Sequence, residues 1–312
     1  MDRLTENKVV LVTRRTRLDD LVARFNTVSQ AKFYVEHMGA DFSDYLREHA
    51  QYRESVASAV AALERLGRLH VLDRSFLPNF IFGRDDAVVV LGQDGLVANT
   101  VKYTSTQQVV GVNPDPARWE GALLPFAVRD LETIIPDVFA HRRPIKKVTM
   151  AKAELNDGQT LYAVNDLFIG VRSHVSARYT IRVGKKIEQH SSSGIVVSTG
   201  LGSTGWFRSL MTGAAKVASE ASGGTVSVEP LGGFAWDSDY LYYTVREPFP
   251  SKTSSATLVF GRISRDSPLV LISQTPEAGV IFSDGIESDF LAFNSGAHAT
   301  ITVAEKRGHV VI

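Results

Sequence analysis

Short apolar runs alternate with amphipathic stretches over roughly the first 140 residues. Continuous β-branched and aliphatic runs predict buried strands at residues 8–13, 68–72, 86–91 and 108–112. Apolar residues at helical spacing predict helices over residues 16–26, 30–38, 41–66 and about 96–103. Strands that alternate with helices are typical of parallel β-α-β units. We therefore expect a Rossmann-like α/β domain over residues 1–138.

The pattern becomes strand-rich after Arg142-Arg143-Pro144. Strands are predicted over residues 145–155, 159–169 and 179–188, with turns at 156–158 and at Gly184-Lys185. One helix is predicted from about Trp206 to Ser222, and the last ninety residues have the pattern of short strands around glycine turns. We expect a mostly β, β-sandwich-like nucleotide-binding domain over residues 139–312, whose C-terminal tail packs back on the first domain.

Composition and charge narrow the classes of function. The 312 residues include 34 Lys plus Arg and 34 Asp plus Glu. The chain therefore lacks the excess of basic residues that nucleic-acid-binding proteins usually show. The absence of cysteine excludes disulfides, thiolate metal sites and cysteine nucleophiles. No apolar run approaches 18 residues, and the first six residues lack an apolar signal core. We expect a cytoplasmic protein that does not enter a membrane.

The first candidate site is Gly92-Gln93-Asp94-Gly95, which predicts a tight turn between a buried strand and a helix. Ligands of open α/β sheets bind beyond the carboxyl ends of the strands, where a helix N-terminus favours an anion. The Asp94 carboxylate could accept a proton from a substrate hydroxyl there. An ordinary β-α turn remains the alternative interpretation.

The second candidate is the glycine- and hydroxyl-rich segment from Ser198 to Gly205. Glycines permit close approach of the backbone to a ligand, and hydroxyls can bind phosphate or ribose oxygens. Gly200, Gly202 and Gly205 also fit the dinucleotide fingerprint Gly-x-Gly-x-x-Gly, with Glu229 near the end of the next predicted strand. That fit supports a rival hypothesis, a nicotinamide-dependent oxidoreductase. A glycine-lined turn without a ligand is the structural alternative.

Two shorter motifs and one basic cluster complete the set. Asn165-Asp166 interrupts an apolar run, where an amide and a carboxylate need partners and could bind ribose hydroxyls. Ser283-Asp284-Gly285 has the composition of a turn. Arg14, Arg15 and Arg17 could bind phosphate, although such clusters are more often solvated loops.

The eight histidines show no metal-binding spacing, and no P-loop or Gly-x-Ser-x-Gly motif is present.

In this order, the four motifs resemble those of the ATP–NAD kinase superfamily, which also contains diacylglycerol and sphingosine kinases. That family carries Gly-Gly-Asp-Gly, an Asn-Glu pair, a Ser-Thr-Pro-Thr-Gly-Ser-Thr segment and a late Asp-Gly. The chain resembles most closely the branch of mitochondrial-type NAD kinases, through residues 11–17, 111–116, 192–194, 198–203 and 245–248. The resemblance implies a Rossmann-like domain, a β-sandwich-like domain and transfer of the ATP γ-phosphoryl group to the 2′-hydroxyl of the adenosine ribose of NAD.

The resemblance also implies roles for individual residues. Asp94 matches the catalytic aspartate and would act as general base. Nucleotide-binding positions match at Gly92, Gly95, Asn165, Asp166, Ser193, Gly202, Ser203, Thr204 and Asp284. ATP would be the phosphoryl donor, NAD the substrate, and Mg²⁺ would come with ATP. The family also implies a homodimer or homotetramer.

The chain departs from the family pattern at several positions. Gln93 replaces the second glycine of the first motif, and Leu96 and Leu201 stand where hydroxyl side chains are usual. Asp166 replaces the glutamate of the pair, and Ser193 replaces an aspartate, as it does in the mitochondrial branch. Two alternatives therefore stay open. One is a homologue that binds or senses a dinucleotide without phosphoryl transfer, and the other is a kinase for a different hydroxyl acceptor.

Overall fold

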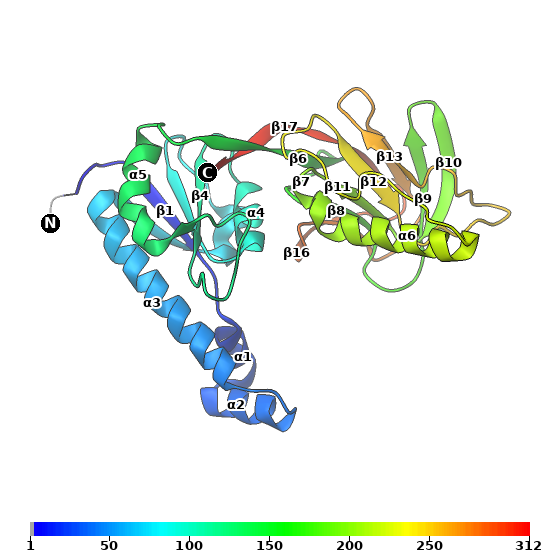
Figure 1. Ribbon diagram of the computed structural model, residues 1–312. Coiled ribbons are helices and arrows are strands. Elements are labelled where there is room, and N and C mark those ends of the chain that lie inside the picture. The colour runs from blue at the N-terminus through cyan, green and yellow to red at the C-terminus, as the bar shows by residue number, and fades with distance from the viewer. Residues whose placement is uncertain (1–2) are drawn as a thin grey trace. The chain divides into compact units, whose positions relative to one another are not determined.

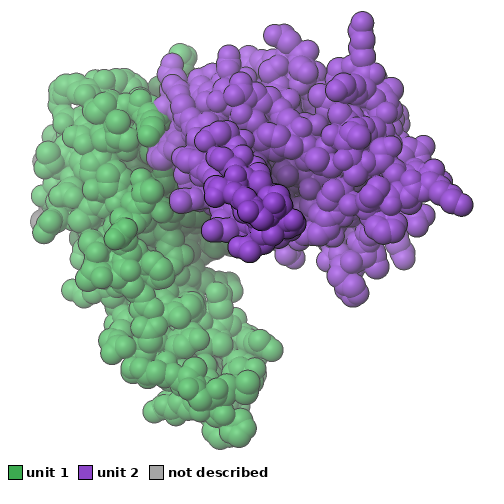
Figure 2. Space-filling view, turned by 45° about the vertical axis from the view of Figure 1, so that its right-hand side comes forward, with its two compact units in different colours: residues 1–146, 309–312 green, residues 147–308 purple. Residues whose placement is uncertain are grey.

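The computed structural model describes residues 3–312, which form two compact units, coloured separately in Figure 2. Unit 1 runs to Lys146 and also contains His309–Ile312. Unit 2 comprises Lys147–Gly308. The assignment of separate functions to residues 1–138 and 139–312 stays a prediction.

Unit 1 is built on a parallel sheet with strand order β2–β1–β3–β4, of which Figure 1 labels β1 and β4. The short β5 and the end of β17 also pair in parallel with β4. Strands β1 and β3 are almost wholly buried, as expected for a parallel sheet covered on both faces. The bounds are β1 Lys8–Thr13, β2 Arg68–Asp73, β3 Ala87–Leu91, β4 Gln108–Asn113, β5 Phe126–Ala127 and β17 His298–Val311.

The helices of unit 1 bury their apolar faces against this sheet and against one another. Helices α3 and α5 pack on the face that carries Leu11 and Val89. Helix α5 contains Pro136, and the sequence pattern did not predict it. Burial of Leu131, Ile134, Ile135 and Val138 outweighs the lost proline hydrogen bond. The bounds are α1 Arg17–Phe25, α2 Val28–His37, α3 Ser43–Leu66, η1 Arg74–Asn79, α4 Asp94–Val101, η2 Val128–Asp130 and α5 Leu131–Phe139.

A network of ion pairs joins the segment after β1 to helix α3. Arg118 forms a bidentate pair with Asp44 at 2.6 and 3.0 Å, and Arg17 also contacts Asp44, at 2.7 Å. Glu48 is almost fully buried and pairs with Arg14 at 3.1 Å and with Arg17. Burial removes most of the hydration of the Glu48 carboxylate, and the ion pairs with Arg14 and Arg17 must offset that unfavourable free energy.

Unit 2 contains two sheets. The first has the order β10–β9–β14–β17, and β6 pairs with both β17 and β7. The second is antiparallel, with the order β13–β12–β11–β8–β15–β16. The bounds are β6 Ile145–Leu155, β7 Thr160–Ala163, β8 Asp166–Val171, β9 Ala177–Val183, β10 Lys186–Ser192, β11 Ile195–Ser198, β12 Leu241–Val245, β13 Phe260–Ile263, β14 Leu269–Ser273, β15 Gly279–Ser283 and β16 Ile286–Ala292.

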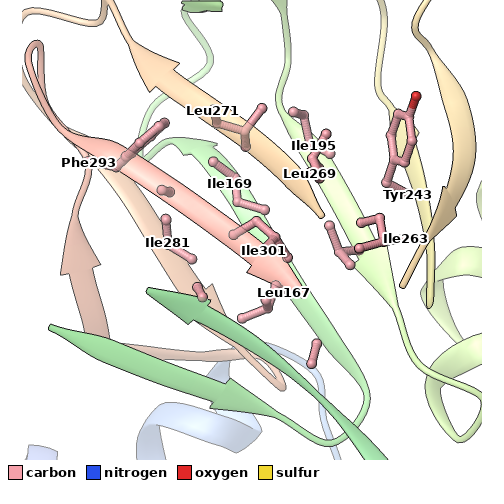
Figure 3. Packing of buried hydrophobic residues seen from close by; sticks show 14 of the residues in the cluster. Leu167, Ile169, Ile195, Tyr243, Ile263, Leu269, Leu271, Ile281, Phe293 and Ile301 are labelled. Atoms are coloured by element: carbon pink, nitrogen blue, oxygen red, sulfur yellow. The ribbon is translucent and has the colours of Figure 1, made fainter. Parts of the chain in front are cut away.

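The core of unit 2 lies between these two sheets (Figure 3). Leu167, Ile169 and Ile281 of the second sheet meet Leu271 and Ile301 of the first. Helix α6 (Trp206–Ser222) covers the other face of the second sheet, where Phe207 and Met211 pack on Tyr242. The prediction of an α/β part with a parallel sheet and a strand-rich part is confirmed at this level.

Two predicted elements of unit 2 differ from the structure. Residues 159–169 form two strands, because the chain leaves the ladder at Val164 and Asn165. The end of the chain contains one strand of 14 residues, β17, where only short strands were expected.

No helix within residues 3–312 is long and apolar enough to cross a bilayer.

The ion-pair network predicts a loss of stability in acid. Hydrogen bonds from Arg118 and Arg17 lower the pKa of Asp44, and burial of Glu48 opposes, without cancelling, the lowering of its pKa by Arg17 and Arg14. Both carboxylates are therefore more acidic in the folded chain than their ordinary values of about 4. Their stabilisation is present above pH about 4.3 and is lost as the pH falls through the lowered folded values.

We expect Glu48→Gln to flatten the fall of the melting temperature between pH 6 and pH 3. Calorimetric melting across that range measures it. Glu64→Gln, at an exposed position of the same helix without an ion pair in the described chain, is the matched control. An equally steep fall in Glu48→Gln and in the native chain would show that this network does not govern acid stability.

Candidate functional site

The first motif lies where β3 passes into α4. Gln93 is the residue before the helix, with φ −117° and ψ 163°, and α4 begins at Asp94. The predicted turn over residues 92–95 is therefore shorter, since Asp94 and Gly95 belong to the first helical turn. An extended φ is open to every residue, so the backbone at Gln93 does not require the glycine of the family pattern. No atom lies within 4 Å of the position a Gly95 Cβ would take.

The carboxylate of Asp94 holds a neighbouring loop. Its Oδ2 accepts the Ala122 N–H at 3.0 Å, and its Oδ1 accepts the Leu123 N–H at 2.8 Å. Asp94 is half-buried and stands in the first turn of α4, where the helix dipole favours a negative charge. Each oxygen keeps a lone pair for a further donor. The motif aspartate is thus fixed in position and can still accept a proton.

Tyr52 joins the two loops that leave the carboxyl ends of β1 and β3. Its hydroxyl donates to the Leu91 carbonyl at 3.0 Å and accepts the Arg14 N–H at 2.9 Å. The segment that begins at Arg14 therefore lies beside the segment that begins at Gly92. In an open α/β sheet this edge is the place where ligands bind.

A cavity of about 480 Å³ opens beside Tyr52. Arg14 lines it with a side chain that is 9% exposed and whose Nε has no hydrogen-bond partner. Arg15 also lines it, is exposed and forms no ion pair within residues 3–312. The carboxylates of Asp19 and Asp73 stand on the same wall. Two guanidinium groups with unused donors could bind an anionic group such as phosphate.

In unit 2, the Asn165-Asp166 pair lies at the break between β7 and β8. Asp284, about 120 positions away in the chain, accepts the N–H groups of that break. Its Oδ1 is 3.1 Å from Val164 N, 2.6 Å from Asn165 N and 3.3 Å from Asp166 N. The fold thus brings the third and fourth sequence motifs together. The amide of the Asn165 side chain makes no hydrogen bond within the described chain.

Asp166 is the carboxyl group of this cluster with an unused acceptor. Its Oδ1 is buried and has no hydrogen-bond partner. Burial raises the pKa of Asp166 to about 7, the Asp284 charge adds to this rise, and the Ser198 side chain opposes it. An acid that titrates near neutral pH could donate or accept a hydrogen bond with a ribose hydroxyl.

The glycine-rich segment packs directly on the same break. The Thr199 hydroxyl donates to the Val164 carbonyl at 2.6 Å, and Thr199 N–H donates to the Asn165 carbonyl at 3.0 Å. A Cβ on Gly202 would lie 2.3 Å from the Asn165 carbonyl oxygen, and one on Gly200 would lie 1.9 Å from the Ala235 carbonyl oxygen. These two glycines are needed for contact between protein backbones. Ligand approach does not explain them.

The remaining predicted residues fall in different places. The Ser203 side chain is fully buried, donates to the Gly200 carbonyl at 2.7 Å and accepts the Phe234 N–H at 3.1 Å. Thr204 is exposed and ends the short helix η3 (Gly202–Thr204). Ser193 precedes β11 at the end of that strand opposite Ser198, and its N–H donates to the Arg246 carbonyl. The structure therefore does not bring Ser193 to the Asn165-Asp166 break of its own chain.

A small aromatic cavity of about 170 Å³ lies on the outer face of the second sheet of unit 2. The Phe168 and Trp206 rings stack with centroids 5.8 Å apart. The Arg246 guanidinium lies 5.6 Å from the Trp206 ring, and its Nε is buried without a partner. The Arg246 guanidinium also pairs with Glu247 at 3.6 Å. Aromatic faces beside a guanidinium group suit a flat heteroaromatic ring. The sequence interpretation missed this cavity because its residues come from four separate segments without a local motif.

The structure removes the observation on which the oxidoreductase hypothesis rested. A dinucleotide fingerprint must lie between parallel strands of a β-α-β unit. Here the strand before the glycines, β11, pairs with β8 and β12, and both are antiparallel to it. Glu229, the residue expected near a strand end, lies in no strand.

Within residues 3–312, no group of three or more acidic or histidine side chains is placed to hold a metal ion.

Comparison with solved structures shows the fold. A yeast NADH kinase complexed with NADH aligns over 99% of this chain and 84% of its own, with 15% identity and a TM-score of 0.54. An NAD kinase from Archaeoglobus fulgidus in complex with ATP aligns over 98% and 93%, with 15% identity and a TM-score of 0.55. No protein-family model matches the chain, and no curated protein matches it in sequence. The chain therefore shares the fold of these kinases at low sequence identity.

The contact between Gly202 and Asn165 gives a test of this assembly. We expect Gly202→Ala to destabilise the chain by about 1–3 kcal/mol, because its Cβ overlaps a backbone oxygen. Gly213→Ala is the control, since Gly213 lies exposed within α6 with no atom within 4 Å of its Cβ position. It should stabilise the chain by about 0.5–1 kcal/mol. Denaturant unfolding measures both, and equal effects would contradict the close contact.

Proposed function

We propose that the chain is an NAD kinase-type phosphotransferase that uses ATP to phosphorylate the 2′-hydroxyl of the adenosine ribose of NAD. The observation that carries this proposal is the assembly of the Asn165-Asp166 pair by Asp284, about 120 residues later. It supports the interpretation that the third and fourth motifs act together. The shared fold with an NADH kinase and an NAD kinase adds to this support.

The proposed chemistry needs one proton acceptor and well-placed phosphates. Asp94 accepts the proton of the ribose 2′-hydroxyl through a free lone pair of its carboxylate. The hydroxyl oxygen forms a bond to the γ-phosphorus as the bond from that phosphorus to the bridging oxygen of ADP breaks. The two N–H bonds from Ala122 and Leu123 hold the carboxylate in one orientation. Phosphoryl transfer depends mainly on such positioning and on neutralised charge.

We assign the ATP phosphates to the cavity beside Tyr52. Arg14 and Arg15 offer guanidinium donors to oxygen anions there. The N-terminus of α4, which follows the neighbouring strand β3 at the same edge of the sheet, offers N–H groups of its first turn. Gln93 and Gly95 flank Asp94 in the sequence, and Gly92 directly follows β3. Mg²⁺ would come with ATP and would neutralise part of the charge of its phosphates.

We assign the dinucleotide to unit 2. The free amide of Asn165 and the unpartnered Oδ1 of Asp166 can bind ribose hydroxyls. The exposed Thr204 adds a hydroxyl from the glycine-rich segment. The cavity of Phe168, Trp206 and Arg246 suits one of the two heteroaromatic bases. A homodimer or homotetramer, a contact of Ser193 with a nucleotide and a cytoplasmic location stay predictions.

A second candidate function is dinucleotide binding without phosphoryl transfer. Two observations favour it. Both oxygens of Asp94 already accept N–H groups, and the Gln93 side chain occupies the position before the helix without capping it. Loss of transfer would leave the binding groups of unit 2 unchanged. A kinase for another hydroxyl acceptor differs from the proposed NAD kinase only in the substrate.

The Asp94→Asn variant separates the two candidates. We expect it to lower NADP formation by at least about two orders of magnitude, the usual contribution of a general base. NAD affinity should be unchanged, because Asp94 belongs to unit 1 and the groups assigned to the dinucleotide belong to unit 2. Purified protein with NAD, ATP and Mg²⁺ is assayed with a coupled NADP-specific dehydrogenase, and NAD binding is measured by calorimetry on the same sample.

The control for this experiment is the melting temperature, since an asparagine amide also disturbs the Ala122 and Leu123 contacts. Unchanged turnover in Asp94→Asn would remove Asp94 as the base. NAD binding by a native chain that forms no NADP would favour the second candidate. A native chain that neither binds NAD nor forms NADP would reject both.

The Arg15→Ala variant tests the phosphate assignment. Loss of one charge-assisted hydrogen bond should raise the KM for ATP about tenfold, with the KM for NAD unchanged. Steady-state kinetics with each substrate varied in turn measure this. Arg129→Ala, at a guanidinium that is 88% exposed in the same unit, is the control. Equal effects of the two variants on the KM for ATP would contradict the assignment.

A further inference from the structure

We propose that Asp284 is a positioning residue for the Asn165-Asp166 pair and does not itself bind the nucleotide. This inference rests on the proposed function and replaces the ligand-binding role that the sequence resemblance implies for Asp284. It follows from where the hydrogen-bonding capacity of this carboxylate is used.

The carboxylate of Asp284 receives three successive backbone N–H groups. Oδ1 accepts those of Val164, Asn165 and Asp166, and Oδ2 shares the Val164 N–H at 3.1 Å. The contact is mutual, since Asp284 N–H donates to the Asp166 carbonyl at 2.9 Å. A carboxylate has about four lone-pair sites, so most of its acceptor capacity faces the protein. A nucleotide hydroxyl would have to compete with these donors.

The backbone of the break depends on this carboxylate. Strand β7 ends at Ala163 and β8 begins at Asp166, so Val164 and Asn165 lie outside the ladder of hydrogen bonds. Val164 is fully buried, and a buried N–H without an acceptor is unfavourable. Asp284 supplies the acceptor that a neighbouring strand would otherwise provide. The direction of the Asn165 side chain is set by the same backbone.

The turn that carries Asp284 presents the carboxylate in a fixed direction. Asp284 has φ +54° and Gly285 has φ +72°, so both lie in the left-handed region. Aspartate, asparagine and glycine are the residues that adopt this conformation most readily. Two matched substitutions, Asp284→Asn and Asp284→Gly, are therefore available without added backbone strain.

Asp284 also acts on its neighbour through charge. Its negative charge raises the pKa of Asp166 beyond the rise that burial causes, and Asp284 is the charged group that contributes to this shift. Asp166 keeps a buried Oδ1 without a partner. The Asp284 carboxylate thus fixes the backbone of the Asn165-Asp166 pair and favours the protonated form of Asp166. The break presents an amide and an acid that titrates near neutral pH.

The two variants separate the hydrogen bonds from the charge. Asp284→Asn can place its amide oxygen at the Oδ1 position and keep the Asn165 and Asp166 contacts without the charge. We expect its NAD affinity to stay within about threefold of native, and the pKa of Asp166, followed by carboxyl ¹³C NMR, to fall. Asp284→Gly removes the acceptor, so NAD affinity should fall about tenfold or more while the KM for ATP is unchanged.

Hydrogen exchange gives a readout that does not depend on the ligand. The Asn165 amide should exchange slowly in the native chain and in Asp284→Asn, and rapidly in Asp284→Gly. The control is Asp157→Gly, because Asp157 also accepts a backbone N–H, that of Gln159, in the turn before β7. It should leave both NAD affinity and Asn165 exchange unchanged.

The outcomes distinguish failure of this inference from failure of the proposed function. Equal losses of NAD affinity in Asp284→Asn and Asp284→Gly would show that the carboxylate contacts the nucleotide, and would overturn the inference. Equal Asn165 exchange in all variants would overturn it as well. A native chain that does not bind NAD rejects the proposed function, and Asn165 exchange then still decides whether Asp284 positions the pair.

Discussion

Backbone N–H groups that leave regular secondary structure need an acceptor, and in this chain two motif aspartates provide it. Asp94 accepts the N–H groups of Ala122 and Leu123, and Asp284 accepts those of the break at Val164 and Asn165. In both places an irregular segment is fixed by an ionised side chain from a distant part of the sequence. Asn165 stands on the second of these segments, and Asp94 is itself held by the contacts of the first, so the geometry of both candidate groups depends on these hydrogen bonds.

The glycines of the motifs divide into two groups by what surrounds them. Gly200 and Gly202 lie against carbonyl oxygens of the protein, so their lack of a side chain serves internal packing. Gly95 and Gly205 are exposed, with open space or only a distant contact at the Cβ position. A glycine-rich segment therefore combines positions that close the fold with positions that leave room for a ligand. Sequence alone does not distinguish them.

The sequence predicts an element well where one local signal dominates. β1 and α6 match their predicted bounds because a continuous apolar run and an amphipathic period mark them clearly. α5 was missed because Pro136 argues against a helix until its burial is known. The motifs located the candidate residues, but their partners lie far away in sequence. Nothing in the pattern around Tyr52 distinguishes a hydroxyl that joins two loops from an ordinary core aromatic.

Strand β17 contributes residues to both units, and it is the last strand in the order of synthesis. Its end pairs with β4, Ile312 N–H donates to the Pro144 carbonyl, and His309–Ile312 belong to unit 1. A ribosome makes those residues only after all of unit 2 has been synthesised. The parallel sheet of unit 1 therefore stays open at one edge while the β-rich unit emerges. The same strand also pairs with β14 of unit 2, so its synthesis completes the sheets of both units.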